Sequence, residues 1–176
     1  MQDLELKIPP LLLVVVCALD MWLLSWIFSS WSFVVADIWV VVSFTLGTIL
    51  AFFGVVEFKR RQTTVNPMHP EETTQIVDTG VYRLTRNPMY LGMLLWLLAC
   101  GLYLGNWAGL VMLPVFVAYM TRFQIKPEER QLETLFGDAY LNYQKRVRRW
   151  LRGEGKGSKS LLPLRRLEGV TNTDTH

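Results

Sequence analysis

Long apolar runs and shorter polar stretches alternate along this chain. The runs that stand out are Pro10–Val35, Ile38–Val56, Tyr90–Leu104 and Trp107–Met120. A membrane-spanning helix needs about 20 predominantly apolar residues, which the first two runs supply, while the last two are shorter. Gly105-Asn106 between the last two runs is a turn signal, so these runs are expected to form a tight helical hairpin. The pattern predicts an all-α integral membrane protein built as a bundle of about four transmembrane helices.

A different pattern follows the fourth run, between Arg122 and Leu151. Apolar residues recur there every three or four positions and fall on one face of a helix: Leu132, Phe136, Tyr140, Tyr143, Val147 and Leu151. Basic residues take the opposite side: Lys145, Arg146, Arg148, Arg149 and Arg152. Pro127, followed by two glutamates, suits a helix start. We therefore expect a C-terminal amphipathic helix at the cytoplasmic membrane surface or packed back on the bundle.

Composition and charge support this picture. Hydrophobic residues make up 51% of the 176 positions, which is too apolar for an ordinary soluble domain. The 18 basic residues lie before the first run, between the second and third, and after the fourth, whereas the short connections at Asp37 and Asn106 hold none. By the positive-inside rule both termini and the central loop face the cytoplasm. Topology and anionic lipid account for these basic residues, so no nucleic-acid role is inferred.

The same patterns divide the chain into three parts. Residues 1–58 form an N-terminal transmembrane hairpin, and residues 59–152 contain the cytoplasmic loop, the second hairpin and the amphipathic helix. Residues 153–176, rich in Gly, Ser, Lys and Thr, are expected to be a flexible tail.

Candidate chemistry lies at the start of the third run. Asn87-Pro88 is a helix start signal, because Asn can cap free backbone N–H groups and Pro fits the first helical position. Arg83 and Arg86 stand within one turn before it. Two guanidinium groups beside a helix N-terminus suit a carboxylate or a phosphate. The alternative is a plain membrane helix with interfacial Arg and Tyr anchors.

Other polar or reactive residues are weaker candidates. His69, in a turn-rich loop, could contact a ligand or act as a base, although a lone loop histidine is more often a surface residue. Asp20, within the first run, either lines a substrate pocket or bonds a neighbouring helix. Cys17 and Cys100 lie within predicted spans without metal-ligand spacing, so we expect small buried side chains and no metal site.

Two motifs follow each other along the chain: Tyr82-Arg83 with Arg86-Asn87-Pro88-Met89-Tyr90-Leu91-Gly92, and Pro127-Glu128-Glu129 with Leu132, Phe136-Gly137, Tyr140, Tyr143 and Val147. Together they resemble the isoprenylcysteine carboxyl methyltransferase and phospholipid methyltransferase superfamily of integral membrane enzymes. The resemblance covers residues from Thr64 to Leu151. It implies a helical bundle that binds S-adenosylmethionine on its cytoplasmic side and receives a lipophilic substrate from the bilayer.

The resemblance also assigns site residues. One wall of the cofactor site would comprise Tyr82, Arg83, Arg86, Asn87, Pro88 and Tyr90, and the other Glu128, Glu129, Tyr140 and Tyr143. His69 is added as a candidate cofactor contact because of its place in the loop, and not because of the resemblance. Arg86, Asn87 and Glu129 are the catalytic candidates. Asn87 stands where the eukaryotic enzymes usually have histidine, so any proton transfer specific to that histidine is not expected here.

The sequence thus predicts a membrane methyltransferase that moves a methyl group from S-adenosylmethionine to a lipophilic carboxylate, thiol or amine. Two alternatives stay open. An NADPH-dependent membrane reductase of related architecture would carry a similar C-terminal motif. A non-enzymatic membrane scaffold would use the basic helix for lipid or partner contact.

Overall fold

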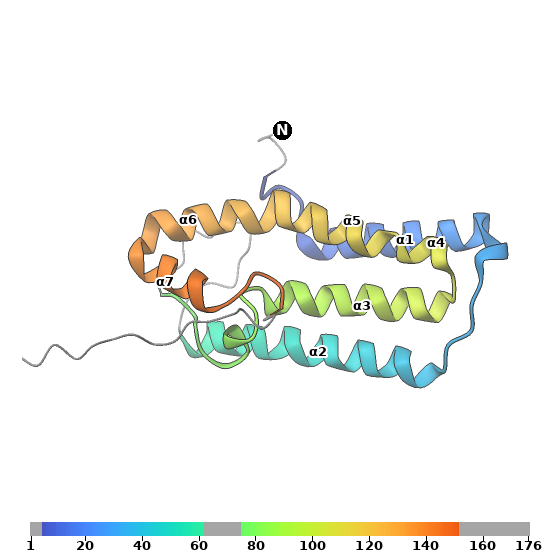
Figure 1. Cartoon of the computed structure of the whole chain (residues 1–176), viewed down its shortest axis with the longest axis horizontal. Coiled ribbons are helices and arrows are strands. Elements are labelled where there is room, and N and C mark those ends of the chain that lie inside the picture. The colour runs from blue at the N-terminus through green and yellow to red at the C-terminus, as the bar shows by residue number, and fades with distance from the viewer. Residues whose placement is uncertain (1–4, 62–74, 152–176) are drawn as a thin grey trace, which may run out of the picture.

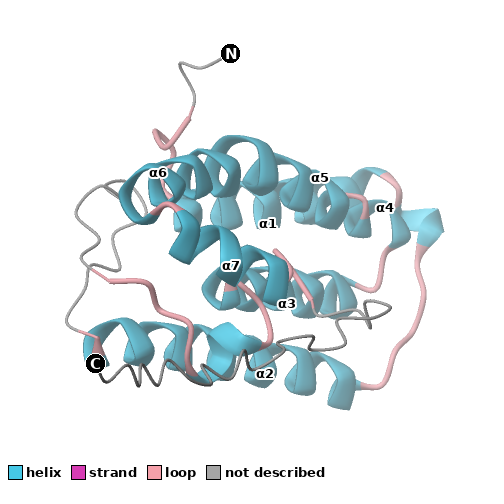
Figure 2. Ribbon diagram, turned by 60° about the vertical axis from the view of Figure 1, so that its left-hand side comes forward, coloured by secondary structure: helices cyan, strands magenta, loops and turns pink. Residues whose placement is uncertain are grey.

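The computed structural model describes residues 5–61 and 75–151, and helices are the regular elements throughout them (Figure 2). The helices are α1 (Pro10–Ile27), α2 (Asp37–Arg60), α3 (Pro88–Leu104), α4 (Trp107–Leu110), α5 (Met112–Tyr119), α6 (Lys126–Phe136) and α7 (Asp138–Arg146). Short 3₁₀ turns lie at Ser29–Trp31 and Gly80–Arg83, and a π-helical segment spans Met120–Ile125. The all-α fold class expected from the sequence is confirmed.

Three helical stretches are long and apolar enough to cross a membrane. They are α1, α2 and the 30-residue stretch Trp107–Phe136, in which α4, α5, the π-helical segment and α6 follow one another (Figure 1). α3 is a shorter apolar helix of 17 residues, at the lower limit of about 17–25 residues for a span. Each apolar run of the sequence therefore contributes a helix to the bundle.

The first apolar run is less helical than expected. It was predicted to span through Val35, but α1 ends at Ile27. The chain then turns and lies against the α3–α4 connection, where the Asn106 side chain donates to the Phe28 carbonyl (2.8 Å) and the Phe33 N–H donates to the Gly105 carbonyl (2.7 Å). These bonds satisfy backbone groups that would otherwise have continued the helix.

The predicted turn between the last two runs is confirmed. Gly105 ends α3 with a φ of +57°, which glycine adopts without a Cβ penalty. The side chain of Asn106 then accepts from the Ala108 N–H (2.9 Å) and so caps the next helix.

The C-terminal helix differs from the prediction in its bounds. Pro127 and the two glutamates after it fall in the first turn of α6, as predicted, but α6 continues the fourth span directly through the π-helical segment. The helix breaks at Gly137, which has a φ of +50°, and α7 ends at Arg146. The single helix predicted up to Leu151 is therefore two helices followed by an irregular segment.

The predicted apolar face nevertheless packs as expected. Tyr140, Tyr143 and Val147 form a buried cluster with Leu132, Phe136 and Ile76 around them. Leu151 is 64% exposed and lies outside this cluster. Because the break at Gly137 lets α7 fold back beside α6, the two helices share one apolar face instead of extending it along a single axis.

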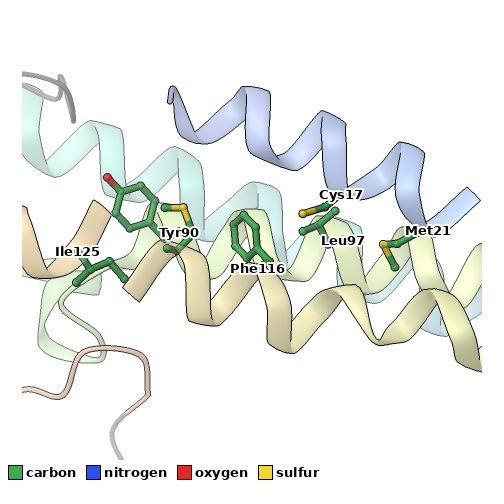
Figure 3. Close-up of a cluster of buried hydrophobic side chains, with 7 residues drawn as sticks. Cys17, Met21, Tyr90, Leu97, Phe116 and Ile125 are labelled. Carbon is green, nitrogen blue, oxygen red and sulfur yellow. The ribbon is translucent and has the colours of Figure 1, made fainter. Parts of the chain in front are cut away.

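α3 lies at the centre of the bundle, between α2 on one side and α1 with α5 on the other (Figures 1 and 2). The main buried cluster joins α1, α3 and the long fourth helix through Cys17, Met21, Tyr90, Leu97, Phe116, Met120 and Ile125 (Figure 3). Cys17 is one of these small buried side chains, as expected, and Cys100 is half-buried and also unpaired. Tyr90 lies in this cluster near the start of α3, so the apolar core reaches the polar end of the bundle.

α2 and α3 approach each other closely at glycines. A Cβ atom on Gly47 would lie 2.7 Å from the Gly92 carbonyl oxygen, and one on Gly92 would lie 2.5 Å from the Gly47 carbonyl oxygen. Both distances are shorter than any real contact of a Cβ atom. The Trp96 indole donates to the Thr48 hydroxyl (3.1 Å) beside this contact. Small residues that let backbones approach are typical of membrane helix pairs.

We therefore expect Gly92→Leu to push α3 away from α2. Overpacking of this kind costs about 1–3 kcal/mol, which corresponds to a fall of roughly 2–12 °C in the unfolding temperature in detergent. The control is Thr45→Leu, which places the same side chain at an exposed position of α2. Equal shifts for the two variants would show that the glycine contact does not determine the packing.

Candidate functional site

Three segments far apart in sequence meet at the start of α3. They are the loop that precedes α3, the first turn of α6, and residues 147–151 after α7. The Arg86 N–H donates to the Arg148 carbonyl (3.0 Å), while the Thr85 hydroxyl (3.1 Å) and the Asn87 amide (2.9 Å) donate to the Arg149 carbonyl. These hydrogen bonds hold the irregular segment 147–151 against the loop that carries the basic motif.

The start of α3 is built differently from the expectation. The Asn87 side chain makes no capping bond, because its amide is committed to the Arg149 carbonyl. The Thr85 hydroxyl instead accepts from the Asn87 N–H (3.2 Å). Pro88 occupies the first helical position as predicted. Asn87 therefore ties the helix start to the C-terminal segment.

Glu129 is buried between two arginines. Its carboxylate lies 3.1 Å from Arg86 Nη1 and accepts from Arg149 Nε (3.0 Å) and Nη2 (2.6 Å). Glu129 is 7% exposed, and a buried carboxylate is tolerated only when it is paired in this way. The fork of Arg149 supplies the bidentate geometry that gives strong charge-assisted hydrogen bonds. One carboxylate between two guanidinium groups leaves the group with one positive charge in excess.

Glu128, the next residue, has neutral partners. Its Oε1 accepts from the Tyr90 hydroxyl (2.5 Å) and from the Gln124 amide (2.9 Å). Tyr90 is 4% exposed and Gln124 3% exposed. The two adjacent glutamates therefore occupy opposite environments: Glu129 is held by cations, and Glu128 by a phenol and an amide.

Buried tyrosines line the same region. The Tyr143 hydroxyl donates to the Tyr82 carbonyl (2.8 Å), and the rings of Tyr140 and Tyr143 lie 6.0 Å apart. Burial raises the pKa of Tyr140 to about 12; the Glu129 carboxylate adds to the rise and Arg86 opposes it. Burial also raises the pKa of Tyr143 and of Tyr82 well above the ordinary value for a phenol. At neutral pH these phenols stay protonated and act as hydrogen-bond donors rather than as bases.

Three buried polar atoms of the site lack a hydrogen-bond partner among residues 5–61 and 75–151. They are the Tyr82 hydroxyl oxygen and the Nε and Nη1 atoms of Arg86. Arg86 Nη1 is close enough to Glu129 for an ion pair, but it is not directed at that carboxylate as a hydrogen bond requires. Buried polar groups in native proteins are nearly always satisfied, so such groups need a partner. A phenol and a guanidinium in this state fit a ligand with carboxylate or hydroxyl oxygens.

The structure brings most of the predicted site residues together: Tyr82, Arg86, Asn87, Pro88, Tyr90, Glu128, Glu129, Tyr140 and Tyr143. Arg83 is exposed on the loop. His69 lies outside the described residues, and Asp20 is half-buried on α1. The roles assigned to these residues stay predictions.

Sequence reasoning missed Arg149, Thr85 and Gln124. Arg149 was placed on the solvated side of a helix, together with Arg146 and Arg148, because the periodic pattern was extended to Leu151. The helix ends at Arg146, so the direction of the Arg149 side chain no longer follows that pattern. The available signal was charge balance, since a buried acidic side chain needs nearby cations or donors.

Comparison with known proteins identifies the family. The profile of the phospholipid methyltransferase family matches residues 35–139, more than half of the chain. The chain belongs to this family. This confirms the resemblance seen in the motifs. The family consists of membrane methyltransferases that use S-adenosylmethionine and methylate lipophilic substrates. Together, the apolar helices and the family make it an integral membrane protein.

Individual relatives agree with the family. Protein-S-isoprenylcysteine O-methyltransferase B of Arabidopsis thaliana is 31% identical over 102 residues, which cover 58% of this chain and 52% of the plant protein. The Schizosaccharomyces pombe protein-S-isoprenylcysteine O-methyltransferase is 32% identical over 72 residues, covering 41% of this chain and 30% of its own length. A Haemophilus influenzae protein described as uncharacterized is 48% identical over 66 residues, 36% of this chain and 100% of that protein. The chain thus spans about half or less of the isoprenylcysteine methyltransferases named here.

Loss of the Arg149 side chain tests the buried ion group. Arg149→Gln should destabilise the protein by about 1–3 kcal/mol, because Glu129 would lose its bidentate partner while staying buried. The matched control is Arg148→Gln, since Arg148 is exposed and contributes its backbone carbonyl, and its effect should stay within about 0.5 kcal/mol. Thermal unfolding in detergent measures both. Equal destabilisation would contradict the importance of the Glu129 contact.

Proposed function

We propose that this protein transfers a methyl group from S-adenosylmethionine to a lipophilic acceptor, and that the buried polar group at the start of α3 binds the cofactor. The observation that supports this most directly is that Tyr82 and Arg86, beside Glu128 and Glu129, keep buried donors without a hydrogen-bond partner in the described part of the chain. All four residues lie inside the region matched by the family profile.

Methyl transfer from S-adenosylmethionine requires the enzyme to position donor and acceptor, and it requires no nucleophilic side chain. When bound, S-adenosylmethionine supplies an electrophilic methyl group on a sulfonium. The chain has to hold donor and acceptor in line and to exclude water, and such positioning can lower a barrier by several kcal/mol. The site fits this task because its polar residues are fixed by hydrogen bonds from three segments and covered by Tyr140 and Tyr143.

Arg86 is the residue we assign to the cofactor's carboxylate. Its side chain is 10% exposed, and its Nε has no hydrogen-bond partner among the described residues. The excess positive charge of the Arg86–Glu129–Arg149 group favours an anion. The start of α3 at Pro88 adds a favourable partial charge. Tyr82 would donate its hydroxyl to a second oxygen of the ligand.

The two glutamates have different proposed roles. The Glu129 carboxylate is already satisfied by two arginines, so we assign it, together with Asn87, to holding the catalytic arrangement in place. Glu128 has no cationic partner among the residues that the structure describes, so its carboxylate is the one suited to ribose hydroxyls or to the cofactor's ammonium group. The Tyr90 ring, which Glu128 holds through its hydroxyl, offers a flat surface to a sulfonium.

The acceptor group that we propose is a carboxylate, a thiol or an amine. The names of the relatives point to an isoprenylcysteine carboxylate, and the family name to a phospholipid. Basic residues flanking the spans favour a site on the cytoplasmic side with both termini there. Accessibility labelling of single cysteines placed at the two ends of the bundle would test this orientation.

Calorimetric titration of the purified protein in detergent tests the function. We expect micromolar binding of S-adenosylmethionine and of its demethylated product, and none of NADPH. Binding of NADPH alone would favour the reductase, and absence of binding by all three in a folded sample would favour the scaffold.

The role of Arg86 is tested by Arg86→Gln in the same titration. Loss of a charged hydrogen bond should weaken cofactor binding by about 10- to 100-fold. Arg149→Gln is the matched control, because it breaks the other half of the same ion group without removing the proposed ligand contact. If both variants lose affinity equally, Arg86 acts through Glu129 and not on the ligand.

Tyr82 gives a second, separable test. Tyr82→Phe removes a hydroxyl that has no partner in the described chain, so the free energy of unfolding should stay constant or rise while cofactor affinity falls about tenfold. Tyr143→Phe should do the reverse and lower stability by about 1 kcal/mol, because it removes the bond to the Tyr82 carbonyl. Unchanged affinity in Tyr82→Phe would remove Tyr82 from the binding site.

A further inference from the structure

The segment before α1 is bound to the fourth helix where that helix departs from α-helical geometry. Pro127 has no N–H, so it cannot donate a hydrogen bond to the carbonyl of Phe123, four residues earlier. The chain is π-helical over Met120–Ile125 at this point, and the Leu6 N–H donates to the Phe123 carbonyl (3.1 Å). A backbone group from the N-terminal segment thus satisfies the carbonyl that the proline leaves free.

The side chain of Glu5 adds to this attachment of the chain before α1 to the long helix. Its carboxylate pairs with Arg122 (2.8 Å), inside the π-helical segment, and also with Arg130 on α6. The Glu5 side chain is 15% exposed, and the hydrogen bond from Arg122 lowers its pKa, so it is charged at neutral pH. Arg122 lies before Pro127 and Arg130 after it. The Glu5 carboxylate therefore fixes the two parts of the helix on either side of Pro127 relative to each other.

The backbone conformation of Leu6 shows the effect of these contacts. Its φ is +58°, in the left-handed region that a leucine adopts only under constraint. Such conformations persist where surrounding contacts enforce them, and they concentrate at functional sites. The contacts that enforce it here are the Glu5 bridge and the bond to Phe123. Residues 5 and 6 are therefore held in place by a backbone hydrogen bond and by side-chain ion pairs.

The same helical residues carry site side chains on another face. Gln124 and Glu128 contact Tyr90 or each other, and the Thr121 hydroxyl accepts from the Trp150 indole (3.1 Å). In Figure 1 the N-terminal segment lies against the long helix on the side away from α3. A π-helical turn changes the register of the residues that follow it, so whatever fixes this turn also fixes the direction in which Glu128 points.

We propose that Glu5 and Leu6 act as a clamp that sets the register of Met120–Ile125 and thereby positions Gln124 and Glu128 against Tyr90. Glu5 is thus a positioning residue for a site that it does not touch. This inference rests on the proposed function where cofactor affinity is the readout, and it is independent of that function where the conformation of the helix is measured.

The experiment compares Glu5→Gln with Lys7→Gln, an exposed neighbour, in the full chain purified in detergent. Without any ligand, Glu5→Gln should raise amide hydrogen exchange of residues 120–130 by about tenfold, because the helix opens locally more often. S-adenosylmethionine affinity should fall by about tenfold, and Lys7→Gln should change neither quantity. Glu5→Asp should recover part of both effects.

A double-mutant cycle separates positioning from general destabilisation. Glu5→Gln combined with Glu128→Gln should bind the cofactor no more weakly than Glu128→Gln alone, because both changes remove the same contact. Additive losses, or unchanged exchange and affinity in Glu5→Gln, would overturn the proposal. If the wild-type protein binds no S-adenosylmethionine, the proposed function fails and hydrogen exchange alone decides the clamp. If Glu5→Gln does not fold, Arg130→Gln removes half of the bridge and is measured instead.

Discussion

The arrangement at the polar end of the bundle depends on the buried carboxylate of Glu129. A carboxylate that is 7% exposed must be paired, and its partners come from segments on either side of it in the sequence. Arg86 reaches it from the loop before α3, and Arg149 from the segment after α7. The irregular segment 147–151 therefore has to return to the bundle. Once it does, its backbone carbonyls accept from the Arg86 N–H, the Thr85 hydroxyl and the Asn87 amide.

A second constraint comes from Pro127. Helices near a membrane must satisfy their backbone groups internally, because lipid offers no hydrogen bonds. Pro127, within the long helix, breaks that rule at the carbonyl of Phe123. The structure satisfies it with a chain segment from outside the helix and keeps the helix continuous from Trp107 to Phe136. Continuity matters because it carries Glu128 and Glu129 rigidly on a helix that is also packed into the apolar core through Phe116, Met120 and Ile125.

The sequence predicts the periodic parts of this molecule well and the irregular parts poorly. The apolar runs, the Gly105-Asn106 turn and the apolar face from Leu132 to Val147 follow from hydrophobic spacing, and the structure has them. Asn87 was expected to cap a helix, which is the local preference of asparagine, but a tertiary bond to Arg149 takes its side chain. Arg149 itself was misplaced because periodicity was extended beyond the end of α7. No local rule reports that a helix ends early so that one arginine can meet a buried acid.

The position of the site follows from the lengths of the helices. α3 has 17 residues, whereas the helical stretch Trp107–Phe136 has 30, and α6 extends past the start of α3 (Figure 1). α1 and α2 expose large apolar side chains such as Trp22 and Phe52, while α6 and α7 carry charged residues on their exposed sides, among them Arg130 and Lys145. The start of α3 therefore lies where the apolar surface gives way to the polar one. A charged cofactor and a lipophilic acceptor are soluble in different phases, and a residue such as Tyr90, packed in the apolar core and bonded to Glu128, lies at the boundary where both can be held.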